Sequence, residues 1–251
     1  YGPDEQIDIN ACKKFCAEKQ IEYHVIPVKE AYKKFVMDYF KSEYGVESII
    51  VRNIPSKTAI NTTRITSKDK ENILVWQGAV NVERGLEELC EAMKYIDAKL
   101  IIMGQGDIKS DLENKIRQWG IDNKVCFLGR LPFEQMMNET VKAKLAISID
   151  KPTNGNYAIS LPNKIFEYMD AAVPVLVSPL QEIKPIIENY KTGVFIRSYD
   201  PVELAKQIEE LLSDCSQLDS IAENCRIACL EFCWENEEKR ITETLKRLKA
   251  V

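Results

Sequence analysis

Polar side chains recur at helical spacing in the stretch LPNKIFEYMDAAVPVLVS, residues 161–178. At about 100° per residue, Asn163, Lys164, Glu167 and Asp170 share one face of a helix. Lys164 falls in the first helical turn, where a cation opposes the helix dipole unless an anion lies nearby. The pattern therefore favours an anion such as phosphate at this helix start, although ordinary solvent exposure of the polar face explains the same spacing.

The opposite face of this helix is apolar and is expected to pack into a core. The helix begins after Ser160 and Pro162, ends at Val173-Pro174, and leads into a short apolar strand, Val175–Val177. The stretch is thus one αβ unit. Its core-facing positions are predicted to be Ile165, Phe166, Tyr168, Met169 and Ala172.

Apolar runs alternate with amphipathic helices from Asn72 onward. This alternation is typical of a parallel sheet covered on both faces, so we expect a doubly wound α/β fold. The predicted strands lie near Ile73–Gln77, Leu100–Met103, Val125–Leu128, Leu145–Ile149, Val175–Val177 and Val194–Ile196. The predicted helices lie near Gly85–Tyr95, Ser110–Trp119, Pro132–Lys142, Asn163–Ala172, Glu182–Glu188, Pro201–Leu212, Ser216–Cys229 and Glu235–Lys249.

A shorter αβαβ run precedes this region. It comprises a helix over Asn10–Gln20, a strand over Tyr23–Val28, a helix over Lys29–Lys41 and a strand over Ser48–Arg52. We therefore predict an incomplete α/β segment over residues 1–56, a linker over 57–71 and a complete domain over 72–230. A terminal helix over residues 231–251 would dock on its own sheet or cross to the first segment.

The composition disfavours a nucleic-acid-binding protein and a membrane-spanning protein. The 251-residue chain has 39 acidic and 34 basic residues without a dense basic block, so nucleic acid is not an expected partner. No apolar run approaches the roughly 20 residues that span a bilayer, and the start is not a signal peptide. We expect a cytoplasmic location. The chain begins in mid-pattern, which suggests that the natural protein extends further upstream.

Eight cysteines are too sparse for a disulfide scaffold in a chain of this length. Cys225, Cys229 and Cys233 share a helical face, and three thiols could in principle hold a soft metal. A fourth ligand is missing nearby, so burial in a core is the preferred interpretation. The single histidine, His24, lies in an apolar strand pattern and is interpreted as structural.

Glycine-containing loops follow the predicted strands. In an open parallel sheet, ligands bind outside the carboxyl ends of the strands, where such loops and helix N-termini gather. The sequence Gly104-Gln105-Gly106 is only a G-x-G, and Lys109 occupies the place of the third glycine of a dinucleotide fingerprint. An NAD-type loop is therefore disfavoured. Simple turn chemistry explains each glycine taken singly.

Five ordered motifs over residues 72–212 carry a family resemblance: ILVWQGAVNVERGLEEL, LIIMGQGD, VCFLGRLPFEQM, SLPNKIFEYMDAAVPVLVS and TGVFI…DPVELAKQIEELL. The chain resembles the donor-binding C-terminal domain of retaining GT-B glycosyltransferases of the "group 1" type. Residues 23–55 resemble the last part of the acceptor-binding N-terminal domain of that family. Trp234 and the helix after it resemble its closing helix.

The resemblance implies a site for a nucleoside-diphosphate sugar. The departing diphosphate would be stabilised by preorganised donors, so a metal is not required, and the absence of a D-x-D motif agrees with this. No cofactor is implied, since the UDP- or GDP-type nucleotide-sugar is a substrate. The resemblance assigns the diphosphate to Arg84, Ser160, Leu161, Asn163 and Lys164, the ribose to Glu167, and the base to Gly104, Arg130 and Leu131.

Two positions depart from the family pattern. Ile159 stands where the first glutamate of the E-x7-E element would bind the sugar, so Asn154, Asn156 or Tyr157 would substitute, or sugar recognition differs. Ala79 replaces an arginine of the first loop. The family's catalytic partners belong to the first half of the N-terminal domain, which this chain lacks, so no catalytic residue is assigned and little turnover is expected.

We therefore expect a retaining, metal-independent glycosyltransferase that acts on a glycan or lipid-linked acceptor in bacterial surface-polysaccharide synthesis. Peripheral association with the inner membrane would occur through the missing N-terminal domain. Two alternatives stay open. One is a nucleotide-sugar epimerase or hydrolase on the same fold, and the other is a non-catalytic nucleotide-binding or interaction domain.

Overall fold

The computed structural model describes residues 40–45, 49, 51–56, 66–153, 155–158 and 160–249. The chain divides into two compact units, Tyr1–Ser48 and Ile49–Val251. Of the first unit only residues 40–45 are described, and residues 40–44 are helical. The elements predicted over residues 10–39, His24 and the linker residues 57–65 lie outside the described residues.

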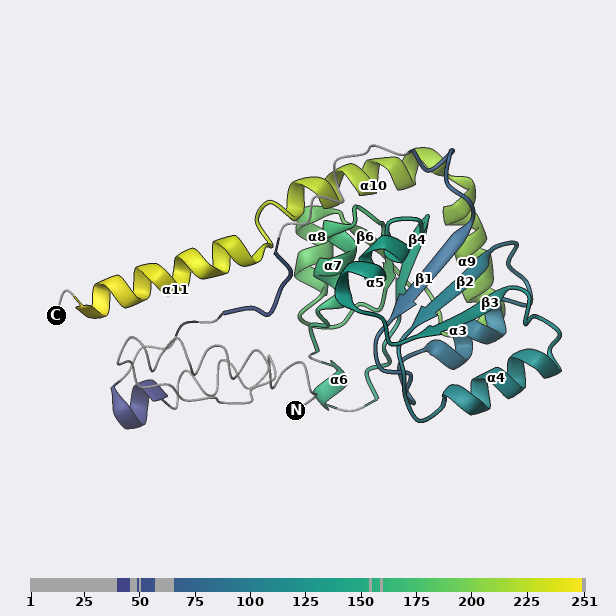
Figure 1. Ribbon diagram of the computed structural model, residues 1–251, viewed down its shortest axis with the longest axis horizontal. Coiled ribbons are helices and arrows are strands. Elements are labelled where there is room, and N and C mark those ends of the chain that lie inside the picture. Colours follow the sequence, from purple (N-terminus) through teal and green to yellow (C-terminus); the bar gives the residue numbers. More distant parts are fainter. Residues whose placement is uncertain are drawn as a thin grey trace. The chain divides into compact units, whose positions relative to one another are not determined.

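Within the described residues, the second unit is built on a six-stranded parallel sheet in the order β3-β2-β1-β4-β5-β6 (Figure 1). The strand order reverses between β1 and β4, as in doubly wound sheets. The predicted fold class is confirmed. The strands are β1 (Ile73–Gln77), β2 (Lys99–Met103), β3 (Val125–Gly129), β4 (Leu145–Ser148), β5 (Val175–Val177) and β6 (Gly193–Phe195).

Helices connect the strands and follow the last one. Asp200 caps α9 by accepting hydrogen bonds from the backbone amides of Val202 and Glu203, and Pro201 occupies the first helical position. Across the described residues, every helix is too short or too polar to cross a lipid bilayer. The helices are α3 (Leu86–Ala92), α4 (Lys109–Gln118), α5 (Phe133–Thr140), α6 (Gly155–Ala158), α7 (Lys164–Asp170), α8 (Lys184–Tyr190), α9 (Pro201–Ser213), α10 (Cys215–Ala228) and α11 (Trp234–Lys249).

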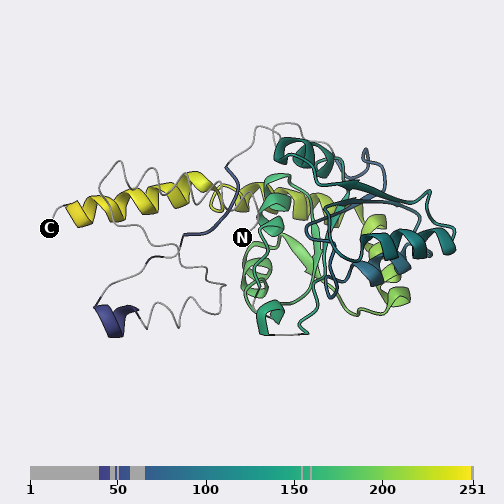
Figure 2. The same ribbon diagram turned by 60° about the horizontal axis from the view of Figure 1, so that its bottom comes forward.

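Two hydrophobic cores lie on opposite faces of the sheet. Successive residues of a strand point to opposite faces, so Leu74 and Trp76 join one core while Val75 joins the other. The first core is covered by α3, α4 and α9, and the second by α5, α7 and α8. Figure 2 shows helices on both sides of the sheet. The continuous apolar character of the strands follows from this two-sided burial.

The cysteine stripe is part of the second core. Cys225 and Cys229 belong to the cluster that packs against α7, and Cys233 is also buried. The interpretation of these residues as core packing is confirmed. Among the described residues, no group of three or more His, Cys, Asp and Glu side chains could hold a metal ion.

The start of α11 contacts the segment before the sheet. The Trp234 amide donates to the Pro55 carbonyl at 3.0 Å, and the Arg52 amide donates to the Glu237 carboxylate at 3.1 Å. The strand predicted over Ser48–Arg52 is wrong at its described positions, since Ile49, Val51 and Arg52 are not in a strand. The Arg52 amide bonds to a side chain of α11 in place of a neighbouring strand.

Replacing Lys191 by glycine is expected to stabilise the domain. Lys191 ends α8 in the left-handed conformation, with φ of 54°, where a Cβ is unfavourable. Because glycine also gains entropy in the unfolded chain, the net gain should be about 0.5 kcal/mol in the free energy of unfolding, measured by urea denaturation. The matched control is Lys206→Gly in α9, which should cost about 1 kcal/mol. An unfolding free energy of Lys191→Gly at or below that of the wild type would contradict the strain argument.

The stability of the domain should rise between about pH 8 and 10.5 through Lys70. Its ammonium donates to the Ala143 carbonyl at 2.8 Å, and burial, with the charge of Arg226, lowers the pKa of Lys70 from 10.5 to about 8. In this window the unfolded chain binds a proton that the folded chain has released, so stability increases with pH. The difference in unfolding free energy between wild type and Lys70→Met should increase across the window. A constant difference would show that Lys70 does not titrate there.

Candidate functional site

A cavity of about 290 Å³ opens at the carboxyl ends of the central strands. The end of β1, the loop from β1 to α3, and helices α5 and α7 form its walls. This is the edge where open parallel sheets bind ligands. The cavity is lined by Trp76, Gln77, Gly78, Ala79, Arg84, Met136, Pro162, Asn163, Lys164 and Glu167.

Two cations of the cavity share one buried carboxylate. Arg84 Nη1 lies 3.0 Å from Asp150 Oδ2, and Lys164 Nζ lies 3.5 Å from Asp150 Oδ1. The Asp150 side chain is 1% exposed, and that of Lys164 is 8% exposed. The Lys164 ammonium also lies 4.8 Å from the centre of the Trp76 ring, and the Arg84 guanidinium lies 4.8 Å from that of Tyr157. The arrangement holds both cations at the cavity wall.

The backbone brings these residues together through close contacts of the loops. Gly85 has φ of 69°, and a Cβ there would lie 2.3 Å from the Ile149 carbonyl oxygen. Only glycine allows the loop after β1 to approach the end of β4 this closely. Arg84, which precedes the glycine, is thereby placed next to Asp150, which follows Ile149.

A second polar group of the cavity is centred on Glu167. Gln77 Nε2 donates a hydrogen bond to Glu167 Oε2, and Thr140 Oγ1 lies 3.0 Å from Gln77 Oε1. The backbone N–H of Gln77 donates to the Tyr168 hydroxyl at 3.2 Å. The end of β1 is therefore tied to both α5 and α7 by polar contacts.

Burial shifts the pKa values of the two ionisable residues of α7 that line the cavity, Lys164 and Glu167. It lowers the pKa of Lys164, and the Asp150 carboxylate opposes that shift. It raises the pKa of Glu167, while the hydrogen bond from Gln77 and the charge of Lys164 oppose it. An anion placed beside Lys164 would stabilise its charged form. The site is therefore chemically suited to a phosphate group.

The structure gathers four of the predicted site residues at one cavity, namely Arg84, Asn163, Lys164 and Glu167. The alternative explanation, a solvent-exposed polar face, is wrong for Lys164 and Asp170, which are both buried. Helix α7 starts at Lys164, one residue later than predicted.

The other predicted positions are not among the residues that line the cavity. Ser160 and Leu161 precede Pro162 and are half-buried, and Ile159 lies outside the described residues. Gly104 packs against the loop after β1, where a Cβ would lie 1.8 Å from the Gly78 carbonyl oxygen. This contact explains the glycine, and a role in base binding stays a prediction. Arg130 and Leu131 follow β3, and their role stays a prediction too.

Sequence reasoning missed Asp150, Gln77 and Trp76. Asp150 stands directly after an apolar strand, where a carboxylate at a sheet edge is a recognisable signal. Gln77 ends the run ILVWQ, so an amide within an otherwise apolar strand was the available signal for it. Neither residue type reveals its partner, because that partner is distant in sequence.

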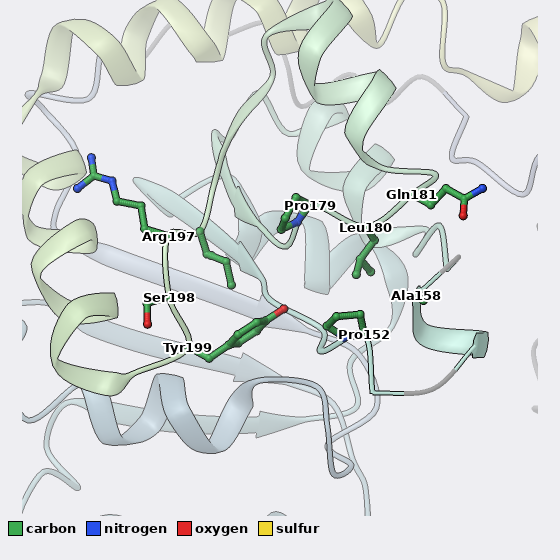
Figure 3. A pocket seen from close by; sticks show the side chains of 9 residues that line it. Pro152, Ala158, Pro179, Leu180, Gln181, Arg197, Ser198 and Tyr199 are labelled. Carbon is green, nitrogen blue, oxygen red and sulfur yellow. The ribbon is translucent and has the colours of Figure 1, made fainter.

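A second cavity of about 250 Å³ lies nearby, at the ends of β5 and β6. Figure 3 shows the side chains of Arg197 and Gln181 directed away from the Tyr199 ring. Arg197 pairs with Glu210, and Ser198 Oγ accepts from the Asp200 amide. The cavity therefore presents mainly apolar surface and does not fit an anion. It is lined by Pro152, Ala158, Pro179, Leu180, Gln181, Ile196, Arg197, Ser198 and Tyr199.

Residues 59–227 match the family model described as "Glycosyl transferases group 1". The chain is 27% identical over 237 residues to the uncharacterized glycosyltransferase MJ1607 of Methanocaldococcus jannaschii, covering 88% of this chain and 59% of that protein. It is 25% identical over 174 residues to an undecaprenol-linked-glycan alpha-1,4-N-acetyl-D-galactosaminyltransferase of Campylobacter jejuni, covering 66% and 46%. The chain thus spans about half the length of these curated relatives.

Solved structures share the fold. The Anabaena protein Alr3699/HepE, crystallised with UDP, superposes with a TM-score of 0.64 at 19% identity, covering 79% of this chain and 57% of that one. A glycosyltransferase from Rickettsia africae superposes with a TM-score of 0.66 at 15% identity, covering 89% and 68%. At these identities the likeness concerns the fold alone.

Replacing Asp150 by asparagine is expected to destabilise the domain by about 3 kcal/mol. The change leaves Lys164 and Arg84 without their shared carboxylate at a buried position. The measurement is the free energy of unfolding from urea denaturation. The matched control is Glu210→Gln, which breaks an exposed pair with Arg197 and should cost less than about 1 kcal/mol. Equal losses of unfolding free energy in the two variants would show that the buried ion pairs contribute no more to stability than the exposed pair does.

Proposed function

The chain belongs to the group 1 glycosyltransferases, and from this premise we propose that the protein transfers a sugar from a nucleoside-diphosphate sugar to a glycan or lipid-linked acceptor. The observation that carries the proposal is the meeting of Arg84, Lys164 and Glu167 at one cavity. Two cations and a carboxylate match the two polar parts of such a donor, its diphosphate and its ribose.

The diphosphate is proposed to bind at Arg84 and Lys164. When the sugar leaves, negative charge grows on the departing phosphate, and preorganised cations stabilise it without reorganisation. Charged donors bind phosphate oxygens more strongly than neutral donors do. Because these two side chains supply the positive charge, the proposed transfer is metal-independent. We also assign backbone amides of Ser160, Leu161 and Asn163 to the phosphates.

The ribose is proposed to bind at Glu167. An ionised carboxylate only accepts hydrogen bonds and can take both hydroxyl groups of a ribose. Gly104, Arg130 and Leu131 are proposed to border the base, since they follow β2 and β3 on the same edge of the sheet. The UDP complex of the Anabaena structure favours a uridine nucleotide as the first candidate, with guanosine as the second.

The acceptor class and the stereochemistry are proposed from the family. The name of the Campylobacter jejuni relative includes an undecaprenol-linked glycan, which favours a lipid-linked acceptor. We propose retention of the anomeric configuration, action in bacterial surface-polysaccharide synthesis, and a cytoplasmic location with peripheral attachment to the inner membrane.

Calorimetric titration of the chain with UDP, GDP and ADP tests the nucleotide site. At least one nucleotide is expected to bind, with the same Kd in the presence and absence of EDTA. Glu167→Ala should weaken that binding by about 1–3 kcal/mol, because ribose hydroxyls lose their acceptor. Lys164→Met should weaken nucleotide and pyrophosphate alike by about tenfold.

Glu210→Ala, at the exposed pair with Arg197, serves as the control and should bind like wild type. If the folded wild-type chain binds none of the three nucleotides, the donor site is wrongly placed. Loss of binding on removal of divalent ions would overturn the metal-independent proposal.

A further inference from the structure

Gln77, the last residue of β1, is a buried glutamine beside Glu167, the proposed ribose-binding residue. It is 2% exposed and points to the face of the sheet covered by α5 and α7. Burying an amide costs free energy unless both of its ends are hydrogen-bonded. The hydrogen-bond partners of the Gln77 side chain therefore determine whether its burial is tolerated.

Each end of the Gln77 amide has its own partner. Nε2 donates to Glu167 Oε2, and Oε1 faces the Thr140 hydroxyl at 3.0 Å. Thr140 is fully buried, and its hydroxyl also lies 2.8 Å from the Met136 carbonyl oxygen. Two different partners fix the orientation of the amide, and the amide in turn restrains one oxygen of the Glu167 carboxylate.

We propose that Gln77 is a positioning residue that orients the Glu167 carboxylate for the ribose of the nucleotide donor. Thr140 supports it by holding the opposite end of the amide. The inference rests on the proposed nucleotide site and deepens it. Gln77 acts through Glu167 and makes no contribution at the phosphates.

The chemistry of the carboxylate agrees with this role. Glu167 lines the cavity, so the oxygen that Gln77 leaves unbonded can accept a hydroxyl group. The hydrogen bond from Gln77 favours the ionised form of Glu167 and opposes the rise in pKa that burial causes. The ionised carboxylate is acceptor-only, whereas the protonated form uses one oxygen as a donor. Lys164, in the turn before Glu167, supports the same form.

A comparison of ligands with and without ribose separates positioning from general structural support. The variant is Gln77→Met, which keeps the side-chain volume and leaves the Thr140 hydroxyl a partner in the Met136 carbonyl. The probes are UDP, GDP and ADP, the 2′,3′-dideoxy form of whichever binds, and pyrophosphate. We expect about tenfold weaker binding of the ribose nucleotide, corresponding to a loss of one well-placed hydrogen bond. Binding of pyrophosphate and of the dideoxy nucleotide should stay within about twofold of wild type.

Gln207→Met is the matched control. Gln207 is also 2% exposed and uses both ends of its amide, with Nε2 donating to the Phe195 carbonyl and Oε1 accepting from the Arg197 amide. It lies on α9, away from the residues that line the first cavity. The control should lower stability in a similar way while leaving the preference for ribose unchanged.

Thr140 provides a second, independent variant. Thr140→Val removes the hydroxyl that faces Gln77 and should reduce ribose-nucleotide binding in the same direction, while Thr140→Ser should restore it. In the Gln77→Met background, Thr140→Val should add no further loss, because both act through one carboxylate. These variants also test the inference should Gln77→Met fail to fold.

Two results would overturn the inference alone. One is an equal loss of pyrophosphate and nucleotide binding in Gln77→Met, which indicates general damage to the pocket. The other is unchanged nucleotide binding in both Gln77→Met and Thr140→Val. If the folded wild type binds no nucleotide, the proposed function fails and the inference falls with it.

Discussion

The buried carboxylate of Asp150, placed between Arg84 and Lys164, is the interaction on which the cavity depends. It neutralises part of the positive charge that the fold collects at the sheet edge. Replacing a buried ion pair by apolar residues is often neutral or stabilising, so such a cluster is weak evidence for a stability role. In the proposed function, the cluster instead holds two cations in place for the diphosphate of the donor.

The parallel sheet supplies the geometry for this cluster. Because β1 and β4 are neighbours although β2 and β3 lie between them in the chain, the loops after β1 and β4 meet. The absence of a side chain at Gly85 lets the first loop touch the Ile149 carbonyl. Helix α7 then closes the cavity with its first turn, where Lys164 lies. Each element contributes one charged group, and the reversal of strand order brings them together.

Much of the fold followed from local patterns. The strands β1 and β5 coincide with their predicted bounds, and β6 begins one residue earlier than predicted. These runs are apolar on both faces, which is a strong local signal of a buried parallel strand. The strand predicted over Ser48–Arg52 shows where this fails, because its apolar residues have no neighbouring strand at the described positions. Whether a segment pairs with a neighbouring strand depends on the whole fold, so the apolar composition of the segment does not reveal it.

The sequence by itself determined most of the elements, the apolar faces and the placement of Lys164 and Glu167 on one face of a helix, because helical periodicity is a local property. Only the tertiary structure decided their partners. Gln77 and Glu167 are 90 residues apart, and Arg84 and Asp150 are 66 apart. The sequence around a polar residue does not indicate which distant group will be its hydrogen-bond or ion-pair partner. That partner depends on which strand ends the sheet brings together.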